Sequence, residues 1–394
     1  MRVVMLKLFE TKMRLSLLLL AFPFMICHGQ NIEMIDSLST SIIQNVYMES
    51  PDEVSSDSSQ AKKKSSLKAY PYVFYTPESK LAFGAGGIYI FYTGQSQNLK
   101  PSKIGFGGYY STNKQYKISM NNVYYFLENK LYFELPLSYG YFINKFWGIG
   151  NDVPDSDTTN YAQQTFSATL TIQVPPELFS ADRTGIIVDY DNTTIRDRMG
   201  NPQLEDPSVI GANGGQLIGL GTDLLWDKRD HLFYPTEGNY QYFRAIVYPE
   251  WSDFVFAQFQ LDARVYYKTN KRGVLAGNFY LESVVGDAPF YKLPSIGGVQ
   301  MRGYFYGRYR DNFFSMIQLE HRQFFAERWG FVVFGTLGNV AEDILKFDFS
   351  NLKYSLGTGL RFKFNKEESV NLRADLGIGI DGSTGIYFGI EEAF

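Results

Sequence analysis

Apolar and polar residues alternate one by one along most of this chain. Through residues 255–268 one parity is apolar or aromatic throughout, whereas the other is mostly polar and includes Asp262 and Arg264. The segments 352–364 and 372–380 repeat this alternation. A period of two is the period of a β-strand, because successive side chains of a strand point to opposite faces of its sheet. The pattern therefore predicts strands that have one apolar and one polar face.

The alternation and the turn signals between its segments predict a barrel. We predict sixteen strands, near residues 70–76, 80–93, 102–112, 115–126, 130–142, 161–174, 183–194, 214–226, 239–249, 254–268, 273–285, 312–325, 330–341, 352–364, 369–380 and 383–394. The connections are short on one side, at 127–129, 270–272 and 365–368, and long on the other, at 143–160, 195–213 and 286–311. An even strand number and loops sorted by length are typical of outer-membrane barrels. The predicted fold class is therefore all-β, a 16-stranded antiparallel transmembrane β-barrel over residues 69–394.

The composition agrees with a β-barrel better than with a helical membrane protein. Aromatic residues make up 17% of the 394 residues, yet the mean hydropathy is only −0.19. In a barrel only alternate residues face lipid, and aromatic residues mark both interfaces, which produces this combination. The formal net charge of −4 offers no basic surface of the kind that nucleic-acid binding needs, so we expect no nucleic-acid partner.

The N-terminal residues predict a targeting segment followed by an extension. Basic residues precede a largely apolar run at 15–26, which is too short to span a bilayer but suits the core of a secretory signal peptide. We place the signal peptide at 1–29 and a periplasmic extension at 30–68. The single cysteine of the chain, Cys27, lies in the signal peptide, so we expect no disulfide in the mature protein.

The extension itself has two parts. Apolar residues recur every three or four positions between 32 and 46, which is helical spacing, and a Ser/Lys-rich stretch at 55–66 predicts a flexible linker. Two interpretations of the apolar stripe remain open. It is either part of a disordered tail or a short amphipathic helix that docks into the barrel or onto a partner.

Catalytic and metal-binding patterns are missing from the mature sequence. His231 and His321 are its only histidines, and it contains neither an H-E-x-x-H nor a G-x-S-x-G motif. The acidic pair Asp189 and Asp191 could attract Ca²⁺, yet it lacks the glycine and the glutamate of a calcium loop. We therefore expect no enzyme activity, no cofactor and no metal.

The C-terminal residues predict how the barrel reaches its membrane. Phe388 and the terminal Phe394 belong to a last predicted strand of alternating apolar residues, which is what outer-membrane barrels present to the insertion machinery. We expect the outer membrane of a Gram-negative bacterium as the location. The expected partners are the lipid bilayer and either outer-membrane assembly machinery or a periplasmic partner.

Two segments are more specific than a generic barrel. The first, DKRDHLFYPTEG at 227–238, follows the eighth predicted strand and contains Asp227, Arg229, Asp230, Pro235 and Gly238. The second, GGVQMRGY at 297–304, lies in the loop after the eleventh strand and contains Gly297, Gly298, Arg302, Gly303 and Tyr304. Together they resemble the BamA/TamA superfamily of outer-membrane insertases and translocases, the bacterial surface antigen family. That family has a D-x-R-D…P-T-x-G turn between strands eight and nine and a G-G-x-x-x-R-G-[Y/F] tip between strands eleven and twelve. Segments at 75–78 and 146–152 look like members from the Bacteroidetes.

The resemblance implies a role for the second segment. In the family the loop that corresponds to 286–311 folds back into the lumen, and its arginine, here Arg302, pairs with acidic residues on the barrel wall. The family's aspartate on strand thirteen is replaced by Thr336 in this chain, so we expect Glu320 or Asp375 to take its place. Arginine suits such pairing because its guanidinium is a rigid, planar fork of donors.

The resemblance also implies a function. It predicts a barrel that assists insertion, assembly or translocation of proteins, or of lipids, at the outer membrane and acts with a partner. Family insertases carry periplasmic delivery repeats before the barrel, and residues 30–67 are too few for even one such module, so we expect a barrel-only member. The alternative is a passive pore or a structural barrel without insertase activity.

Overall fold

The computed structural model describes residues 65–76, 80–94, 99–155, 159–175, 180–198, 200–231, 233–365 and 370–394. The predicted signal peptide, the apolar stripe at 32–46 and nearly all of the Ser/Lys-rich linker lie outside the described residues. The division of the chain at residues 29 and 68 therefore stays a prediction.

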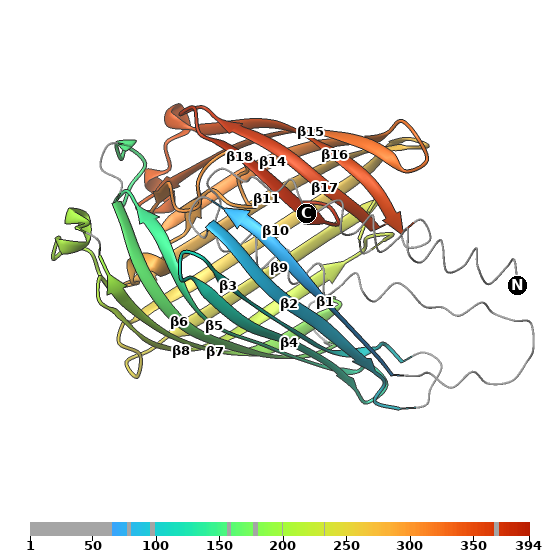
Figure 1. Cartoon of the computed structure of the whole chain (residues 1–394), viewed down its shortest axis with the longest axis horizontal. Coiled ribbons are helices and arrows are strands. Elements are labelled where there is room, and N and C mark those ends of the chain that lie inside the picture. Colours follow the sequence, from blue (N-terminus) through green and yellow to red (C-terminus); the bar gives the residue numbers. More distant parts are fainter. Residues whose placement is uncertain are drawn as a thin grey trace, which may run out of the picture.

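Sixteen antiparallel strands form one sheet in which every strand pairs with its neighbours along the chain (Figure 1). The strands are β1 Ser66–Thr76, β2 Lys80–Phe91, β3 Ser102–Ser111, β4 Tyr116–Phe126, β5 Leu131–Phe146, β6 Thr159–Val174, β7 Arg183–Asp197, β8 Gly214–Asp227, β9 Gly238–Tyr248, β10 Phe256–Asn270, β11 Gly273–Gly286, β14 Phe313–Phe324, β15 Trp329–Ala341, β16 Lys353–Asn365, β17 Val370–Gly379 and β18 Thr384–Ile390. The strand order runs from β1 to β11 and then from β14 to β18, so β1 and β18 are its two ends. The all-β fold and the predicted strands are confirmed.

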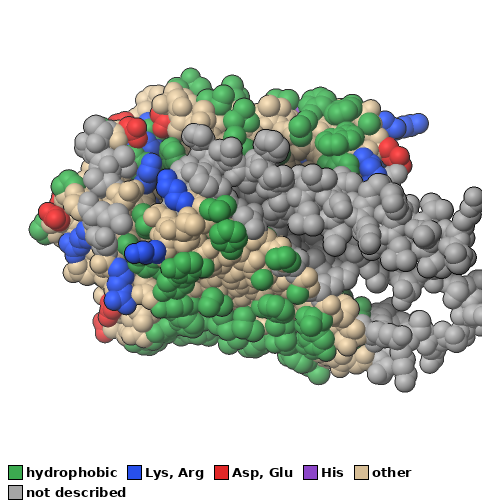
Figure 2. Space-filling model, in the orientation of Figure 1, with side chains coloured by type: hydrophobic (Ala, Val, Ile, Leu, Met, Phe, Trp, Pro, Cys, Tyr) green, Lys and Arg blue, Asp and Glu red, His purple; other side chains and the backbone are tan. Residues whose placement is uncertain are grey.

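The two faces of the sheet differ as the alternation predicts. Along β14, Ile317 and Leu319 are more than half exposed, whereas Gln318 and Glu320 are buried. Figure 2 shows apolar side chains spread over the outside of the molecule. We call this apolar side the outer face and the opposite side the inner face. An apolar outer face is stable when it contacts lipid rather than water, since water would be ordered by so much hydrocarbon surface.

The structure differs from the predicted strands at both ends of the strand order and in the long loop, and other strand ends shift by up to four residues, as in β5, which ends at Phe146 rather than 142. β1 begins at Ser66, four residues before the predicted start. The last strand ends at Ile390 rather than at 394, because Glu391 adopts a left-handed conformation with φ 70° and turns the chain out of the ladder. The long loop contains a second sheet, formed by β12 Ser295–Ile296 and β13 Tyr309–Arg310, which is too short to leave a periodic signal.

The helical parts among the described residues are short 3-10 turns. They are η3 Pro202–Glu205, η4 Phe290–Lys292, η5 Ile344–Lys346 and η6 Phe349–Asn351. Within the described part of the chain, no helix has the length and apolar character needed to cross a membrane.

Candidate functional site on the inner face

The loop between β11 and β14 contains the segment GGVQMRGY, which is enclosed by a small two-stranded sheet. In this sheet of β12 and β13, Ser295 pairs with Arg310 and Ile296 with Tyr309. Gly297 directly follows this sheet and has φ 119°, where a Cβ would lie 2.0 Å from the carbonyl oxygen of Phe305. The motif glycine is therefore required for the turn that directs the tip of the loop toward the sheet.

Arg302 lies at the tip of the loop and is completely buried between two carboxylates. Its Nη2 is 2.5 Å from Oε2 of Glu320 on β14, and its Nη1 donates to Oδ2 of Asp375 on β17. Its guanidinium also lies over the ring of Phe334, 3.5 Å from the ring centroid. The structure thus brings Arg302 together with both acidic residues that the sequence offered as partners.

The two carboxylates also contact other arginines, so the pairs form one buried cluster. Glu320 Oε1 accepts from Arg322 at 2.8 Å, and Asp375 contacts Arg361 at 2.5 Å and Arg373 at 3.2 Å. All six side chains of the cluster, Arg302 included, are at most 7% exposed. Taking so many charges out of water is costly unless each is paired, so this cluster is sensitive to the loss of any one member. The sequence alone did not single out these three arginines.

Gly303 lets the loop tip press against the backbone of β17. Its φ is 116°, and a Cβ would lie 2.9 Å from backbone atoms of Ile378 and Gly379. Gly377 faces it, where an added Cβ would lie 2.7 Å from the nitrogen of Gly303. That nitrogen donates to the hydroxyl of Tyr387 on β18 at 2.7 Å. The tip therefore contacts the last strand of the sheet directly.

Tyr304 completes the attachment of the tip. Its ring is fully buried, and its hydroxyl donates to the carbonyl of Tyr354 on β16 at 2.7 Å and accepts from the nitrogen of Ile380 at 3.1 Å. An aromatic ring with a satisfied hydroxyl can pack and hydrogen-bond at the same point. Arg302, Gly303 and Tyr304 together attach the loop to β14, β16, β17 and β18.

Thr336 lies on the inner face of β15 but does not serve as the partner of Arg302. Its hydroxyl donates to Oε1 of Gln318 at 3.1 Å. The position that is acidic in the family thus holds a neutral threonine that is hydrogen-bonded to Gln318. The carboxylates that contact Arg302 come from β14 and β17 instead.

The base of the loop has a second attachment that the sequence did not indicate. Lys292 lies 3.2 Å from Oδ2 of Asp191 on β7. Burial alone lowers the pKa of Lys292, but Asp191 outweighs it and holds the pKa above its usual value. The neighbouring Asp189 accepts from Thr169 at 2.6 Å and from Tyr248 at 2.8 Å. The acidic pair considered for Ca²⁺ thus contacts protein groups.

The DKRDHLFYPTEG segment forms an ordered turn between β8 and β9. Arg229 donates from Nε and Nη2 to the two oxygens of Asp227, at 2.8 and 2.7 Å. Asp230 accepts from the nitrogen of Thr236 at 2.8 Å and from its hydroxyl at 2.6 Å. Burial raises the pKa of Asp230, but these hydrogen bonds lower the pKa by a larger amount. The net pKa of Asp230 therefore lies below its ordinary value.

The rest of this turn packs against the inner face. Pro235 is buried, and Gly238 has φ 102°, with no room for a Cβ beside the carbonyl of Lys228. Tyr234 is 7% exposed and forms an edge-to-face contact with Phe324 on β14, 5.7 Å between ring centroids. The five motif residues therefore build one turn that closes over the sheet at its short-loop end.

The C-terminal residues turn inward instead of ending a strand. Phe394 is 8% exposed and packs against Tyr266 of β10, and its carbonyl oxygen accepts from Arg322 at 2.9 Å. Glu392 accepts from Arg361 at 2.7 Å and from Asn371 at 2.7 Å. The expectation of an aromatic at the end of the last strand is therefore wrong in its geometry. Phe388 lies in β18, and its side chain is outside the described set.

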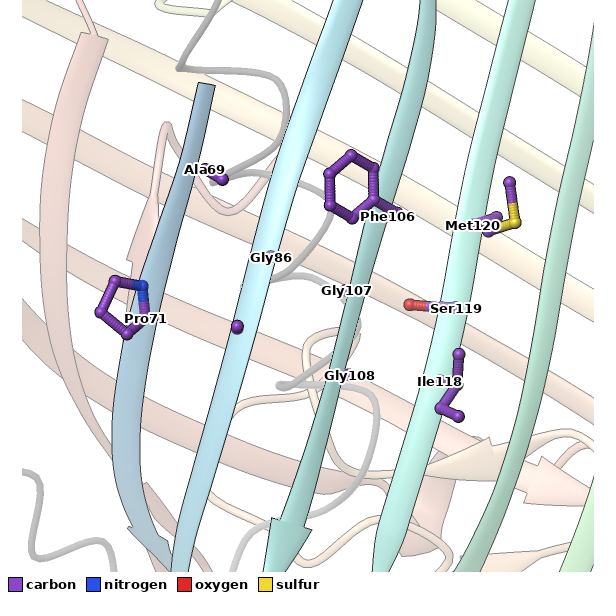
Figure 3. A pocket seen from close by; sticks show the side chains of 10 residues that line it. Ala69, Pro71, Gly86, Phe106, Gly107, Gly108, Ile118, Ser119 and Met120 are labelled. Atoms are coloured by element: carbon purple, nitrogen blue, oxygen red, sulfur yellow. The ribbon is translucent and has the colours of Figure 1, made fainter. Parts of the chain in front are cut away.

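A shallow apolar groove of about 680 Å³ crosses β1 to β4 on the outer face (Figure 3). Phe106, Ile118 and Met120 project beside it and are all more than a third exposed. Its remaining lining consists mainly of small residues, Ala69, Pro71, Ala85, Gly86, Gly107, Gly108 and Ser119. The outer face next to β1, which is one end of the strand order, therefore carries mainly small side chains.

Among the described residues, no three or more His, Cys, Asp or Glu side chains are grouped so that they could hold a metal ion. His231 has a structural contact, since its Nδ1 accepts from the nitrogens of Phe233 and Tyr234 at 3.2 and 3.3 Å.

The curved sheet, its apolar outer face and the loop pinned to its inner face define a transmembrane β-barrel of the bacterial outer membrane. A family model described as the Omp85 superfamily domain matches residues 98–394. The chain belongs to the Omp85 superfamily, whose members are outer-membrane β-barrel proteins of Gram-negative bacteria. The predicted relationship to the BamA/TamA superfamily is confirmed at this level. The link to the Bacteroidetes stays a prediction.

Solved structures of two family members show the same fold. BamA from Haemophilus ducreyi lacking POTRA domains 1-3 matches with a TM-score of 0.56 and 15% identity, over 83% of this chain and 69% of that one. CdiB from Acinetobacter baumannii matches with a TM-score of 0.53 and 11% identity, over 83% of this chain and 59% of that one. At such identities the likeness establishes the fold alone. No curated protein matches the sequence.

Proposed function

We propose that this barrel assists the insertion, assembly or translocation of proteins, or of lipids, at the outer membrane, and that it does so with a partner. Membership of the Omp85 superfamily, with BamA and CdiB as structural neighbours, supports this class of function. The observation that carries the proposal for this chain is the attachment of the loop tip, because Arg302 is buried between Glu320 and Asp375.

The attachment connects the loop to an end of the sheet. The nitrogen of Gly303 donates to the hydroxyl of Tyr387 on β18. Arg302 precedes Gly303 in the chain, so its ion pairs hold Gly303 in place. A rearrangement of β18 that admits a client strand must break or carry along this contact. The loop tip is therefore suited to set how readily the end strand moves. This role is one of positioning and requires no bond-making chemistry.

The opposite end of the strand order supports the same role. β1 contains Pro71, which has no N–H to donate to a ladder. The outer groove beside β1 is lined by small residues that provide little side-chain packing (Figure 3). A strand with weakened packing costs less to displace than one inside the sheet. We propose that clients or lipids are handled between β1 and β18, the two ends of the strand order.

Reconstitution tests the proposal. The purified chain in phosphatidylcholine vesicles should accelerate folding of a urea-unfolded eight-stranded outer-membrane protein, followed by heat-modifiable gel migration, relative to protein-free vesicles. Arg302→Ala should slow this step, because β18 then loses the loop contact that positions it. Arg264→Ala is the matched control, because Arg264 also pairs with an inner-face carboxylate, Asp262, but lies on β10 away from the loop tip.

Two results would count against the proposal. One is equal folding rates with and without the chain, combined with failure to recover assembly components when the chain is purified from outer membranes. The other is a large, stable single-channel conductance, which would favour the alternative of a passive pore. A channel of that kind requires an open lumen.

A further inference from the structure

The loop between β15 and β16 displays large apolar side chains on an ordered framework. Ile344, Leu345 and Phe349 are 63%, 93% and 78% exposed. They lie in η5 and η6, two short turns at the same end of the sheet as the β5–β6 and β7–β8 connections (Figure 1). Loops in contact with water rarely contain clusters of large apolar side chains, because burying such side chains lowers the free energy of the protein.

The turns are held by their own caps. The carboxylate of Asp343 accepts from the nitrogens of Leu345 and Lys346, at 2.8 and 3.1 Å. Asp348 accepts from the nitrogen of Ser350 at 2.7 Å. Local hydrogen bonds therefore fix the backbone of both turns that display the apolar side chains.

Part of the loop packs on the outer side of the sheet, while Asn351 at its end contacts Asn151 and Asp152 of the β5–β6 connection. Phe313 shares its parity along β14 with the lipid-facing Ile317, yet it is only 4% exposed, because the ring of Phe347 covers it at 5.7 Å. Phe347 in turn contacts Phe349, with ring centroids 5.0 Å apart. These three rings form a continuous row from the outer face to the exposed apolar side chains of the β15–β16 loop.

The tip continues the lipid-facing surface. Ile317, Leu337 and Tyr354 are cross-strand neighbours on the outer face, each more than 40% exposed, just below the loop. A strand needs about 9–11 residues to cross a bilayer, and β15 has 13. β15 is therefore long enough to cross the bilayer, and we place the loop that follows Ala341 at the membrane surface.

We propose that Ile344, Leu345 and Phe349 insert into the outer leaflet of the membrane, so that this loop is an interfacial anchor of the barrel. The occupant of the apolar surface is lipid, because the surface is continuous with the face that lipid already covers. Lys346, paired with Glu342 at 2.5 Å, stays among the head groups. Apolar and aromatic side chains at a membrane surface bind by this means. The inference rests on membership of an outer-membrane family and is independent of the proposed function.

Site-directed spin labelling tests the anchor. In a Cys27→Ser background, single labels at Leu345→Cys and Phe349→Cys are placed in phosphatidylcholine vesicles that contain no other protein. Collision with oxygen, which concentrates in hydrocarbon, and with a water-soluble nickel chelate is then measured. We expect oxygen accessibility to exceed nickel accessibility severalfold at both positions.

The control is Glu205→Cys, an exposed position on the 3-10 turn η3 of another loop. It should show the reverse ratio. Nickel accessibility at 345 and 349 equal to that at 205 would overturn the proposal and leave the surface to a protein partner. Low accessibility to both reagents would overturn it in favour of contact between copies of the chain.

A second measurement needs no label. Trypsin should cut after Lys346 severalfold faster when Leu345 and Phe349 are both replaced by serine, because the loop then leaves the membrane surface. Heat-modifiable migration confirms that each variant has folded. An unchanged cleavage rate in vesicles would contradict the anchor.

Discussion

At the scale of single residues, the site depends on how one guanidinium is shared. Arg302 binds Glu320 and Asp375, and each carboxylate has at least one further arginine partner. Breaking an isolated buried pair from one side costs about 3–5 kcal/mol. The remaining arginines keep the two carboxylates paired after Arg302 is removed. The loss is therefore closer to that of a charge-assisted hydrogen bond, about 1.5–3 kcal/mol.

We predict that Arg302→Ala releases the loop tip while the barrel persists, and that Arg302→Lys restores little. An ammonium cannot reach both carboxylates as a planar fork can. Limited proteolysis of residues 297–308 in the folded protein measures the release, and double-mutant cycles with Glu320→Gln and Asp375→Asn measure the coupling. Zero coupling in both cycles would show that these contacts do not hold the loop.

The turn between β8 and β9 should respond to acid at a single residue. Hydrogen bonds from Thr236 lower the pKa of Asp230 in the folded state, so its stabilising contribution is complete above its unfolded pKa of about 3.9 and is lost as pH falls through the lower folded value. Amide exchange at Thr236 and Glu237, corrected for its intrinsic pH dependence, should rise over that range. Asp230→Asn should exchange fast at neutral pH, and a slow amide in this variant would contradict the assignment.

At the scale of elements, the long loop is attached at several points, two of which are ion pairs at its tip and at its base. Its tip contacts β14 and β17, and its base contacts β7 through Lys292 and Asp191. These strands are far apart in the strand order. The loop therefore ties together parts of the sheet that are not hydrogen-bonded to each other.

We predict that the two attachments can be separated. Lys292→Met keeps the apolar stem but removes the charge that pairs with Asp191. Hydrogen exchange at residues 288–294 should accelerate, while residues 300–305 stay protected by Arg302. Arg302→Ala should show the opposite pattern and serves as the internal control. Equal acceleration of both segments in either variant would mean that the loop detaches as one unit.

At the scale of the whole molecule, the C-terminal residues join distant strands. Phe394 packs on Tyr266 of β10, and Glu392 contacts Arg361 of β16. Glu391 lies between β18 and these contacts with φ 70°. The chain end thus crosses the inner face instead of extending the edge of the sheet.

We predict that Phe394→Ala lowers both the amount assembled and the stability of what assembles. Removing a buried phenylalanine side chain costs about 3–5 kcal/mol. Heat-modifiable migration measured against temperature reports the stability, and surface quantification reports the yield. Phe394→Leu is the matched control, since it retains an apolar side chain. A reduced yield with an unchanged unfolding temperature would mean that Phe394 acts during delivery alone.

The fold could be predicted from the sequence because the alternation of apolar and polar residues is a local property. Each strand shows its period of two without reference to any other strand, and the positions of the short turns and long loops follow. The same holds for Arg302, whose neighbours Gly303 and Tyr304 stand beside it in the chain. The three arginines around Glu320 and Asp375 carry no such local signal, since an inner-face arginine looks the same whether or not it meets a carboxylate.

The sequence by itself determined the sixteen strands of the main sheet, the face to which most of their residues point and the residue at the loop tip. Only the tertiary structure decided which carboxylates that tip meets, that Lys292 holds the base and that the chain end turns inward. Arg302 and Asp375 are 73 positions apart. Parity places both on the inner face, but their height along the barrel depends on the register of every strand between them and on the path of the loop. That register is set by cross-strand pairing and packing, which no stretch of sequence contains alone.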